Sequence, residues 1–440
     1  MTMTTTLSFA VRRKNPVLVG PATATPRETK RLSDIDDQEF CRGHVSNVLF
    51  YRGRLQADER DPAVVIRRAL GEALVPYYPL AGRLREVEER KLVVDCTGEG
   101  VLFVEADADV RLAELEASGL RLPFPCMDQL LFKGEGSSDV LNSPLLLIQV
   151  TRLLCGGFVL ALRLNHTMCD AIGIVQFLSA AAELARGLPE PTITPAWSRE
   201  LLTARSPPRA EESCPHPEYD AMPLPPPPSD DMVLRTFTFG PTEMATIRMR
   251  LPPRSPRPSG ALELPPDEQV RLNVVYNFRG VRGLGLPVAG YYGNATVASP
   301  VLSTAGELLA SSPGDTVEMV QKAKAAVTAD FVRSTADLLV LRGRPAMALA
   351  NTFFVSDLRH AGYRRVDFGW GDPVYGGTAY KWPGLGVLLA VRNGGGENAV
   401  GVPILLPPPA MDRFVAEVDM LLTPLPVGAQ ASSLPPRGRL

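Results

Sequence analysis

The stretch that decides the fold runs from Phe158 to Gly187 and reads FVLALRLNHTMCDAIGIVQFLSAAAELARG. It opens with a nearly unbroken apolar run, which is typical of a buried strand. From Ala171 to Arg186 the apolar residues recur at helical spacing, and Gly187 is placed to end that helix. The sequence therefore predicts a strand that turns directly into a helix, with His166 and Asp170 in the turn.

The two polar residues of this turn carry groups that can take part in catalysis. The imidazole of an ordinary histidine has a pKa of about 6.5, which suits removal of a proton from a hydroxyl group and accelerates a reaction by roughly 10²–10⁴. Asp170, at the start of a helix, either caps backbone N–H groups or pairs with a distant cation. With four histidines in the chain, such a spacing arises by chance with a probability of roughly one in five. Alone, the pair fits a structural histidine with a capping aspartate better than an active site, and Cys169 fits a buried filler better than a nucleophile.

A second motif lies about 200 residues downstream of the first. It consists of Asp367, Phe368, Gly369, Trp370 and Gly371. Two glycines that flank a tryptophan specify an unusual backbone, in a loop where the ring packs. Alone, this motif fits a tight turn with a core tryptophan, but its occurrence together with the histidine motif is much harder to obtain by chance.

Together the two motifs resemble those of the plant BAHD acyltransferase family, and the resemblance extends through nearly the whole chain. Further stretches match landmarks of this family: Leu32–Asp36, Tyr77–Arg83, Cys96–Gly100, Asn277–Gly280 and Tyr291–Asn294. The first of these landmarks lies in Leu32–Gln38, which reads LSDIDDQ. This stretch is similar to the sequences of benzyl alcohol O-benzoyltransferases and related alcohol and taxane acyltransferases.

The resemblance implies both a fold and an activity. The fold would be α/β with mixed sheets, in two domains like chloramphenicol acetyltransferase, with an active-site channel at the domain interface. The activity would be CoA-dependent O-acyl transfer, in which a benzoyl or similar group passes from acyl-CoA to a small alcohol and gives an ester. Acyl-CoA would be a co-substrate, with no tightly bound cofactor and no metal. Hydroxycinnamoyl transfer and taxane-type acetyl transfer are alternatives within the same chemistry.

The resemblance also implies a role for each motif residue. His166 would be the general base that deprotonates the alcohol. Asp170 would pair with Arg279 and support the loop that carries His166, without contact to substrate. The run Asp367–Gly371 would be a structural motif beside the channel. The residues that bind CoA are not predicted.

The sequence departs from the family after Leu251. Residues 252–260 read PPRSPRPSG and replace roughly 20 residues of an expected helix, which prolines at this density cannot form. The region after Gly376 and Gly377 is also shorter than in relatives. A degenerate or alternatively spliced paralogue with little or no activity is therefore a further alternative.

Composition changes divide the chain. Prolines crowd residues 206–230, which are expected to form a stiff linker. We expect an N-terminal acyltransferase domain at 1–205, a C-terminal one at 231–425, and a disordered tail at 426–440.

Apolar periodicity predicts the remaining elements. It predicts helices at 61–74, 241–250 and 317–341, and strands at 91–96, 101–105, 145–153, 233–239, 270–277 and 348–356. A short turn at Thr97–Gly100 predicts that the first two strands form a hairpin.

Composition excludes several classes of protein. Hydrophobic residues make up 45% of the chain and charged residues 21%, as in globular proteins. The 46 basic and 48 acidic residues are spread evenly, which argues against a nucleic-acid partner. No apolar run is long enough to span a membrane, and six cysteines without a CxxC pair indicate reduced thiols. We therefore expect a cytoplasmic protein without a membrane partner, and the lack of heptads or repeats favours a monomer.

Overall fold

The computed structural model describes residues 7–53, 60–134, 140–209, 214–222, 231–249, 264–379 and 382–423. The proline-rich stretch 252–260 and the expected tail 426–440 lie outside these ranges, as do parts of the expected linker 206–230. The boundaries of the two expected domains therefore stay a prediction.

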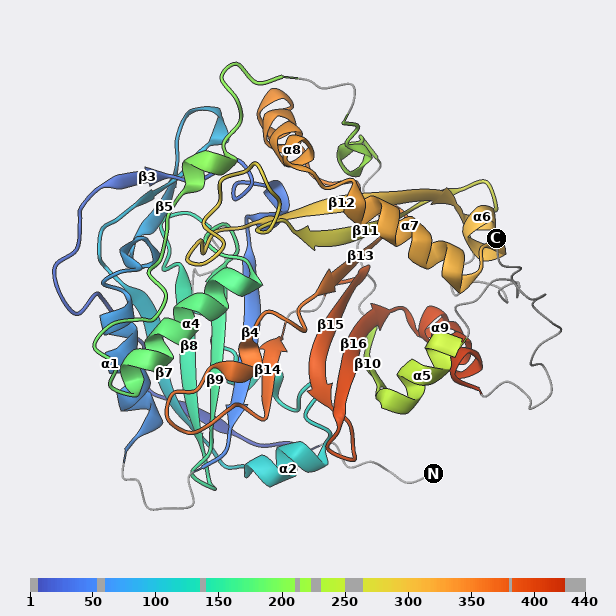
Figure 1. The fold of residues 1–440 in the computed structure, drawn as a ribbon. Coiled ribbons are helices and arrows are strands. Elements are labelled where there is room, and N and C mark those ends of the chain that lie inside the picture. The colour runs from blue at the N-terminus through green and yellow to red at the C-terminus, as the bar shows by residue number, and fades with distance from the viewer. Residues whose placement is uncertain are drawn as a thin grey trace, which may run out of the picture.

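The described chain forms two large mixed sheets and one small sheet, flanked by helices (Figure 1). The larger sheet has seven strands in the order β1-β7-β8-β9-β4-β14, with β2 also paired to β7. It is mixed because β7 and β8 run parallel, whereas β8 and β9 run antiparallel. Its strands are β1 (Val11–Arg13), β2 (Val17–Val19), β4 (His44–Tyr51), β7 (Val101–Ala108), β8 (Leu146–Leu153), β9 (Phe158–Asn165) and β14 (Tyr375–Thr378).

The second sheet has six strands in the order β10-β16-β15-β13-β11-β12. It is mixed as well, because β13 runs parallel to both of its neighbours. Its strands are β10 (Val233–Phe239), β11 (Gln269–Asn277), β12 (Thr296–Thr304), β13 (Thr352–Asp357), β15 (Leu385–Arg392) and β16 (Asn398–Leu406). The small sheet contains β3 (Thr29–Arg31), β5 (Arg83–Glu86) and β6 (Leu92–Asp95).

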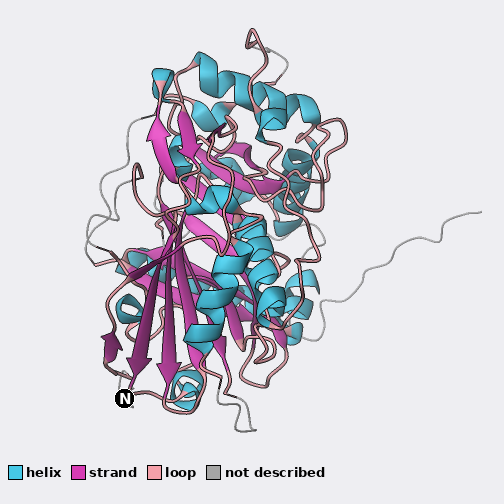
Figure 2. Cartoon of the chain, turned by 90° about the vertical axis from the view of Figure 1, so that its left-hand side faces the viewer, coloured by secondary structure: helices cyan, strands magenta, loops and turns pink. Residues whose placement is uncertain are grey.

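The helices pack on the faces of these sheets. Figure 2 shows the strands of the larger sheet as a layer with helices along one side, and Figure 1 identifies these helices as α1 and α4. The α-helices are α1 (Pro62–Ala73), α2 (Leu112–Ala117), α3 (Met127–Leu130), α4 (Ala171–Ala185), α5 (Pro241–Met249), α6 (Ala305–Ala310), α7 (Pro313–Ala325), α8 (Ala329–Leu341) and α9 (Pro408–Leu422). Short 3-10 helices are η1 (Glu39–Cys41), η2 (Tyr78–Ala81), η3 (Glu88–Arg90), η4 (Arg199–Leu202), η5 (Pro217–Tyr219) and η6 (Tyr363–Arg365). No helix in the described ranges is long and apolar enough to cross a membrane.

The core lies on both faces of the larger sheet, as β4 illustrates. Leu49 and Tyr51 belong to the cluster beneath α1 and α4, whereas Val48 and Phe50 belong to a second cluster on the opposite face. Successive side chains of a strand point to opposite faces, so β4 is apolar at every position in this stretch. The second cluster also includes side chains of β15, so the two large sheets share apolar contacts.

The element that decides the fold is confirmed. The apolar run forms β9, which pairs antiparallel with β8, and α4 begins at Ala171 after the turn. The predicted helices at 61–74 and 241–250 are also present, as α1 and α5.

The predicted hairpin at 91–105 is wrong. Both strands exist, as β6 and β7, but they belong to different sheets. The edge of β7 that a hairpin partner would occupy pairs with β2, in the register Val19↔Val101. Gly98 and Gly100 have positive φ values of 63° and 100°, which allow the chain to leave one sheet and enter the other.

Two further boundaries differ from the prediction. The single helix expected at 317–341 is two helices, α7 and α8. Thr328 caps the second one, because its hydroxyl accepts a hydrogen bond from the N–H of Phe331 at 3.2 Å. The strand expected from residue 348 begins at Thr352, because Asn351 has a positive φ of 50°.

One strand joins the larger sheet from a distant part of the sequence. β14 follows the motif Asp367–Gly371 and pairs antiparallel with β4, in the register Tyr375↔Phe50. The motif is therefore carried to the larger sheet, although most of the neighbouring sequence builds the six-stranded sheet.

Candidate active site

His166 follows β9 directly and lies beside the start of β4. Its backbone N–H donates to the carbonyl oxygen of Gly43 at 2.9 Å. Asn165 closes the turn, because its Oδ1 accepts hydrogen bonds from the N–H (3.2 Å) and the hydroxyl (2.7 Å) of Thr167. Its carbonyl oxygen accepts the N–H of Met168 at 3.0 Å. The backbone around His166 is thus held by short-range hydrogen bonds.

The imidazole of His166 has few protein contacts. The side chain is half-buried, and its ring meets the ring of Phe40 edge to face, with 5.5 Å between the ring centres. Nδ1 is buried and has no hydrogen-bond partner among the described residues. Because the ring is only half-buried, its accessible part can meet a bound substrate and exchange a proton with it.

Asp170 is the N-cap of α4 and is almost fully buried. Its carboxylate accepts hydrogen bonds from the N–H of Gly173 (2.9 Å) and of Ala295 (3.0 Å), and from both terminal nitrogens of Arg279 (2.7 and 2.9 Å). Burial alone would raise the pKa of Asp170, but the charge and hydrogen bonds of Arg279, with the two backbone N–H groups, hold it below its ordinary value. With these four hydrogen bonds, the carboxylate is engaged in holding the turn.

Arg279 therefore lies where the family resemblance implies, against Asp170. It follows β11, in the part of the chain that builds the six-stranded sheet. Its side chain also donates to the carbonyl oxygens of Gly293 (2.7 Å) and Tyr291 (3.4 Å) and to the side-chain oxygen of Asn277 (3.3 Å). The ion pair thus connects the turn that carries His166 to the loop between β11 and β12.

The motif Asp367–Gly371 is folded around its own aspartate. Asp367 Oδ1 accepts hydrogen bonds from the N–H groups of Gly369 and Gly371, each at 2.7 Å. Both glycines have positive φ values, 102° and 81°, which favour glycine. Phe368 is completely buried, and the ring of Trp370 meets a ring of β9 edge to face at 5.3 Å.

This motif and His166 lie at opposite ends of α4. Arg186, directly after α4, donates a hydrogen bond to the carbonyl oxygen of Asp367. The helix has 15 residues, which corresponds to a length of about 22 Å. The structure therefore brings His166, Asp170 and Arg279 together, but it does not bring the tryptophan motif to them.

Cys169 is fully buried beneath the turn. Burial raises the pKa of its thiol well above the ordinary value, so the thiolate that a nucleophile requires is disfavoured. Among the described residues, no group of three or more His, Cys, Asp or Glu side chains is placed to hold a metal ion.

Sequence reasoning missed a residue that contacts the turn. Arg199, only 1% exposed, donates a hydrogen bond to the carbonyl oxygen of Met168 at 2.6 Å. It also forms an ion pair with Asp36, a residue of the landmark Leu32–Asp36. No local pattern marks Arg199, because an isolated arginine is ordinarily a surface residue.

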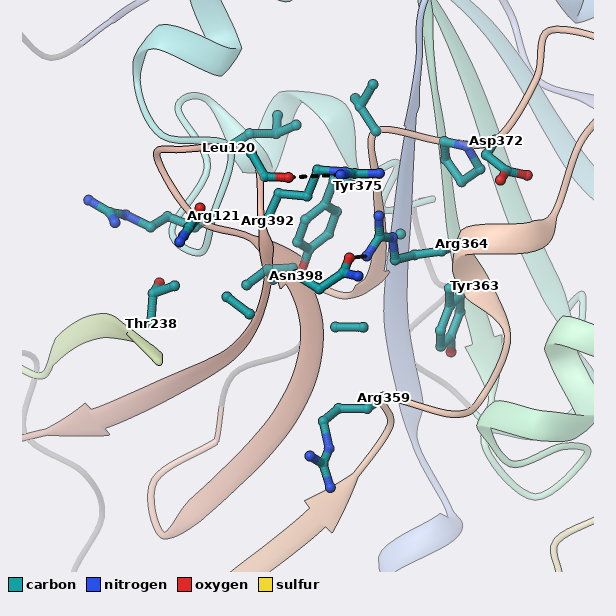
Figure 3. Close-up of a pocket in the computed structure, with 18 of the residues that line it drawn as sticks. Leu120, Arg121, Thr238, Arg359, Tyr363, Arg364, Asp372, Tyr375, Arg392 and Asn398 are labelled. Atoms are coloured by element: carbon teal, nitrogen blue, oxygen red, sulfur yellow. Dashed lines mark hydrogen bonds between the residues drawn. The ribbon is translucent and has the colours of Figure 1, made fainter. Parts of the chain in front are cut away.

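A large cavity opens between the two large sheets, with a volume of about 1320 Å³ (Figure 3). Its wall is rich in arginine and includes the acidic residues Glu116, Glu243 and Asp372. The six arginines are Arg52, Arg121, Arg359, Arg364, Arg365 and Arg392. Burial and the charge of Arg392 lower the pKa of Arg364, as expected where cations gather.

His166 is not among the residues that line this cavity. A residue of the cavity wall nevertheless contacts β4, the strand that begins beside His166. Tyr363 in its wall donates a hydrogen bond from its hydroxyl to Asn47 of β4 at 2.6 Å, and Gly43, which holds His166, directly precedes β4.

Comparison with known proteins identifies the family of the chain. The family described as "Transferase family" matches residues 9–249 and 260–421. A benzyl alcohol O-benzoyltransferase of Petunia hybrida is 48% identical, covering 94% of both chains. A (Z)-3-hexen-1-ol acetyltransferase of Arabidopsis thaliana is 46% identical, covering 95% of this chain and 96% of that protein.

Solved structures share the fold. Vinorine synthase superimposes with a TM-score of 0.70 at 21% identity, covering 94% of this chain and 98% of that chain. The TRI101 protein of F. sporotrichioides, in complex with coenzyme A and T-2, gives a TM-score of 0.66 at 16% identity, covering 88% of this chain and 97% of that chain. These likenesses confirm the expected two-domain α/β fold. With a family match over nearly its whole length and relatives close to half identical, the chain belongs to the transferase family of BAHD acyltransferases.

Proposed function

We propose that this acyltransferase passes a benzoyl or similar acyl group from acyl-CoA to an alcohol, with His166 as general base. The observation that carries this proposal is the half-buried imidazole of His166, which projects from a turn held by hydrogen bonds. The names of the Petunia relative and of a second benzoyltransferase, from Nicotiana tabacum and 47% identical, support benzoyl transfer to benzyl alcohol.

The reaction proceeds in a complex of both substrates. The accessible edge of the His166 imidazole takes the hydroxyl proton while the alcohol oxygen forms a bond to the thioester carbonyl carbon. The carbon–sulfur bond then breaks, and the imidazolium returns the proton to the CoA sulfur. The products are an ester and free CoA, and the imidazole is regenerated without an acyl-enzyme. General base catalysis contributes roughly 10²–10⁴ to the rate, and alignment of the two substrates contributes the rest.

Asp170 and Arg279 support this reaction from a distance. The carboxylate of Asp170 is occupied by Arg279 and two backbone N–H groups, so its role is to hold the turn rather than to share a proton with the imidazole. The motif Asp367–Gly371 serves as a brace at the far end of α4.

The arginine-rich cavity is our candidate for the phosphates of acyl-CoA. CoA carries several negative charges, and arginine pairs with phosphate through two parallel hydrogen bonds. Arg364 and Arg392 in the cavity wall form no ion pair with a carboxylate in direct contact within the described ranges, although the charge of Asp372 acts on Arg364.

We also propose that the protein acts as a monomer in the cytoplasm, without a nucleic-acid or membrane partner. All six cysteines are free, as in proteins of a reducing compartment. Size-exclusion chromatography with light scattering and imaging of a fluorescent fusion in plant cells test the two parts separately.

Purified protein given benzoyl-CoA and benzyl alcohol tests the main proposal. We expect benzyl benzoate and an equal amount of free CoA thiol, and we expect His166→Ala to remove nearly all of both. Equal rates for the two proteins would refute the role of His166. A panel that replaces benzoyl-CoA by acetyl-CoA and by hydroxycinnamoyl-CoA decides the donor, and lack of turnover with every donor would identify an inactive paralogue.

A further inference from the structure

We infer that Asp36, Arg199 and Asn294 form a second clamp, which positions His166 by holding two carbonyl groups of its turn. This carbonyl clamp is separate from the pair of Asp170 and Arg279. The inference rests on the proposed role of His166, and it adds residues that position the base without contacting the substrate.

The clamp grips the turn on both sides of Thr167. Asn294 donates from its side-chain Nδ2 to the carbonyl oxygen of His166 at 2.8 Å. Arg199 donates to the carbonyl oxygen of Met168 at 2.6 Å. These two peptide groups set the orientation of the backbone from which the imidazole projects.

Asp36 joins the two donors. Its Oδ1 accepts hydrogen bonds from the backbone N–H and the side-chain Nδ2 of Asn294, each at 2.9 Å, and forms an ion pair with Arg199. Its Oδ2 accepts hydrogen bonds from the N–H (3.1 Å) and hydroxyl (2.5 Å) of Ser33. The exposed fraction is 0% for Asp36 and 1% for both Arg199 and Asn294. All three side chains are almost fully buried, so bulk solvent does not compete with these hydrogen bonds.

Aromatic rings restrict Arg199 further. The guanidinium carbon lies 4.6 Å from the ring centre of Trp197 and 5.4 Å from that of Tyr292. A guanidinium group between rings loses little additional freedom when it binds a carbonyl oxygen, so it acts as a rigid support.

The backbone is the main determinant of where the imidazole lies. The ring of Phe40 contacts the imidazole, and Nδ1 has no hydrogen-bond partner among the described residues. A rotation of the His166 peptide is therefore passed directly to the ring. A displacement of about 1 Å in a reacting group can lower a rate by roughly 100-fold.

The chain offers a matched control in Asp37, the neighbour of Asp36. Asp37 is also 0% exposed and pairs with Arg42 (2.7 Å) and Arg344 (2.9 Å). It further accepts the N–H of Leu92 at 2.9 Å. None of these partners belongs to the turn of His166. Replacing Asp37 removes a buried carboxylate from the same segment but leaves the carbonyl clamp intact.

The first test compares the kinetics of Asp36→Asn, Asn294→Ala and Asp37→Asn, each measured well below its own melting temperature. We expect the first two to lower kcat by roughly 10- to 100-fold, with KM for both substrates changed much less. Asp37→Asn should lose comparable thermal stability but keep most of its kcat. An equal loss of kcat in all three, or a normal kcat in Asn294→Ala, would overturn the inference. Asn294→Ala removes no charge and serves if Asp36→Asn folds poorly.

The second test does not depend on turnover. The chain has four histidines, so carbon-13 labelling of histidine gives four ring signals, and His166→Ala identifies the signal of His166. We expect Asn294→Ala to shift or broaden that signal and to leave the signal of His360 unchanged, and we expect Asp37→Asn to move neither. An unchanged His166 signal in both clamp variants would disprove the positioning role. An active His166→Ala enzyme would instead disprove the proposed general base, so the two failures are distinguishable.

Discussion

Both terminal nitrogens of Arg279 bind the carboxylate of Asp170, at 2.7 and 2.9 Å, across 109 positions of sequence. Asp170 also caps α4 and accepts the N–H of Ala295. One carboxylate therefore joins the turn of His166, the first turn of a helix and a loop from the other large sheet. The geometry separates His166, the proposed base, from the residues that hold its turn.

Asp170→Asn should lower the free energy of unfolding by about 3–5 kcal/mol, because it leaves the buried charge of Arg279 without a partner. Activity should fall with it. Urea denaturation followed by tryptophan fluorescence measures the stability, and CoA release measures the activity. The double variant with Arg279→Met should be no less stable than Asp170→Asn alone, since the unpaired charge is gone. A loss of activity at unchanged stability would contradict the supporting role.

His44 should make the protein less stable in mild acid. Burial and the charge of Arg163 lower the pKa of His44 from 6.5 to about 4. Between these values the unfolded chain binds a proton that the folded chain does not, so stability is complete above pH 6.5 and is lost as the pH falls toward 4. The loss is at most about 3 kcal/mol, and solvent screening reduces it.

Urea denaturation of His44→Gln between pH 7 and pH 5 checks this. The variant should lose less stability over the interval than the wild type. The exposed His360 supplies the control, since His360→Gln should follow the wild-type curve. A His44→Gln curve as steep as that of the wild type would show that another group causes the acid sensitivity.

Gly369→Ala should destabilise the protein without disturbing the chemistry. A left-handed backbone strains alanine by roughly 1–2 kcal/mol, and Gly369 has a φ of 102°. Differential scanning fluorimetry should show a lower melting temperature. At temperatures where the variant is fully folded, kcat should stay within a factor of about two, because the motif lies at the far end of α4. A large fall in kcat at an unchanged melting temperature would mean that the motif acts in the reaction.

Arg364→Ala should weaken the binding of acyl-CoA. Loss of one charge-assisted hydrogen bond to a phosphate costs about 1.5–3 kcal/mol, so the KM for acyl-CoA should rise by roughly tenfold or more. Arg68→Ala removes a surface arginine from α1, where Arg68 pairs with Glu72, and should leave this KM unchanged. If the KM for the alcohol rises instead, the cavity serves the acceptor.

Much of the fold was predictable because the deciding signals are local. The apolar run of β9 and the helical spacing of α4 and of α1 lie within single segments. The predictions of the hairpin at 91–105 and of a single helix at 317–341 were wrong for different reasons. The edge of β7 is taken by β2, and the register Val19↔Val101 cannot be read from either strand alone. Thr328 was overlooked as a cap because it lies inside the single helix that was predicted at 317–341.

Some residues of the candidate site were predicted from the sequence, and one was not. His166, Asp170 and Arg279 were found because they lie in recognisable motifs. Arg199 was not found, because its importance comes from burial and from its contacts with Met168 and Asp36. Such contacts join segments that share no pattern, so only the folded chain shows them.

The pairing of β14 with β4 has a consequence for the synthesis of the protein. Residues 375–378 complete the sheet next to residues 47–50, so that edge of β4 stays open until more than 300 further residues have been made. At about 5–20 residues per second, the wait on the ribosome is on the order of 15 to 65 s. An unpaired edge invites association with other nascent chains. The yield of the protein in cells should therefore depend on chaperones that shield this edge during synthesis, whatever the stability of the folded protein.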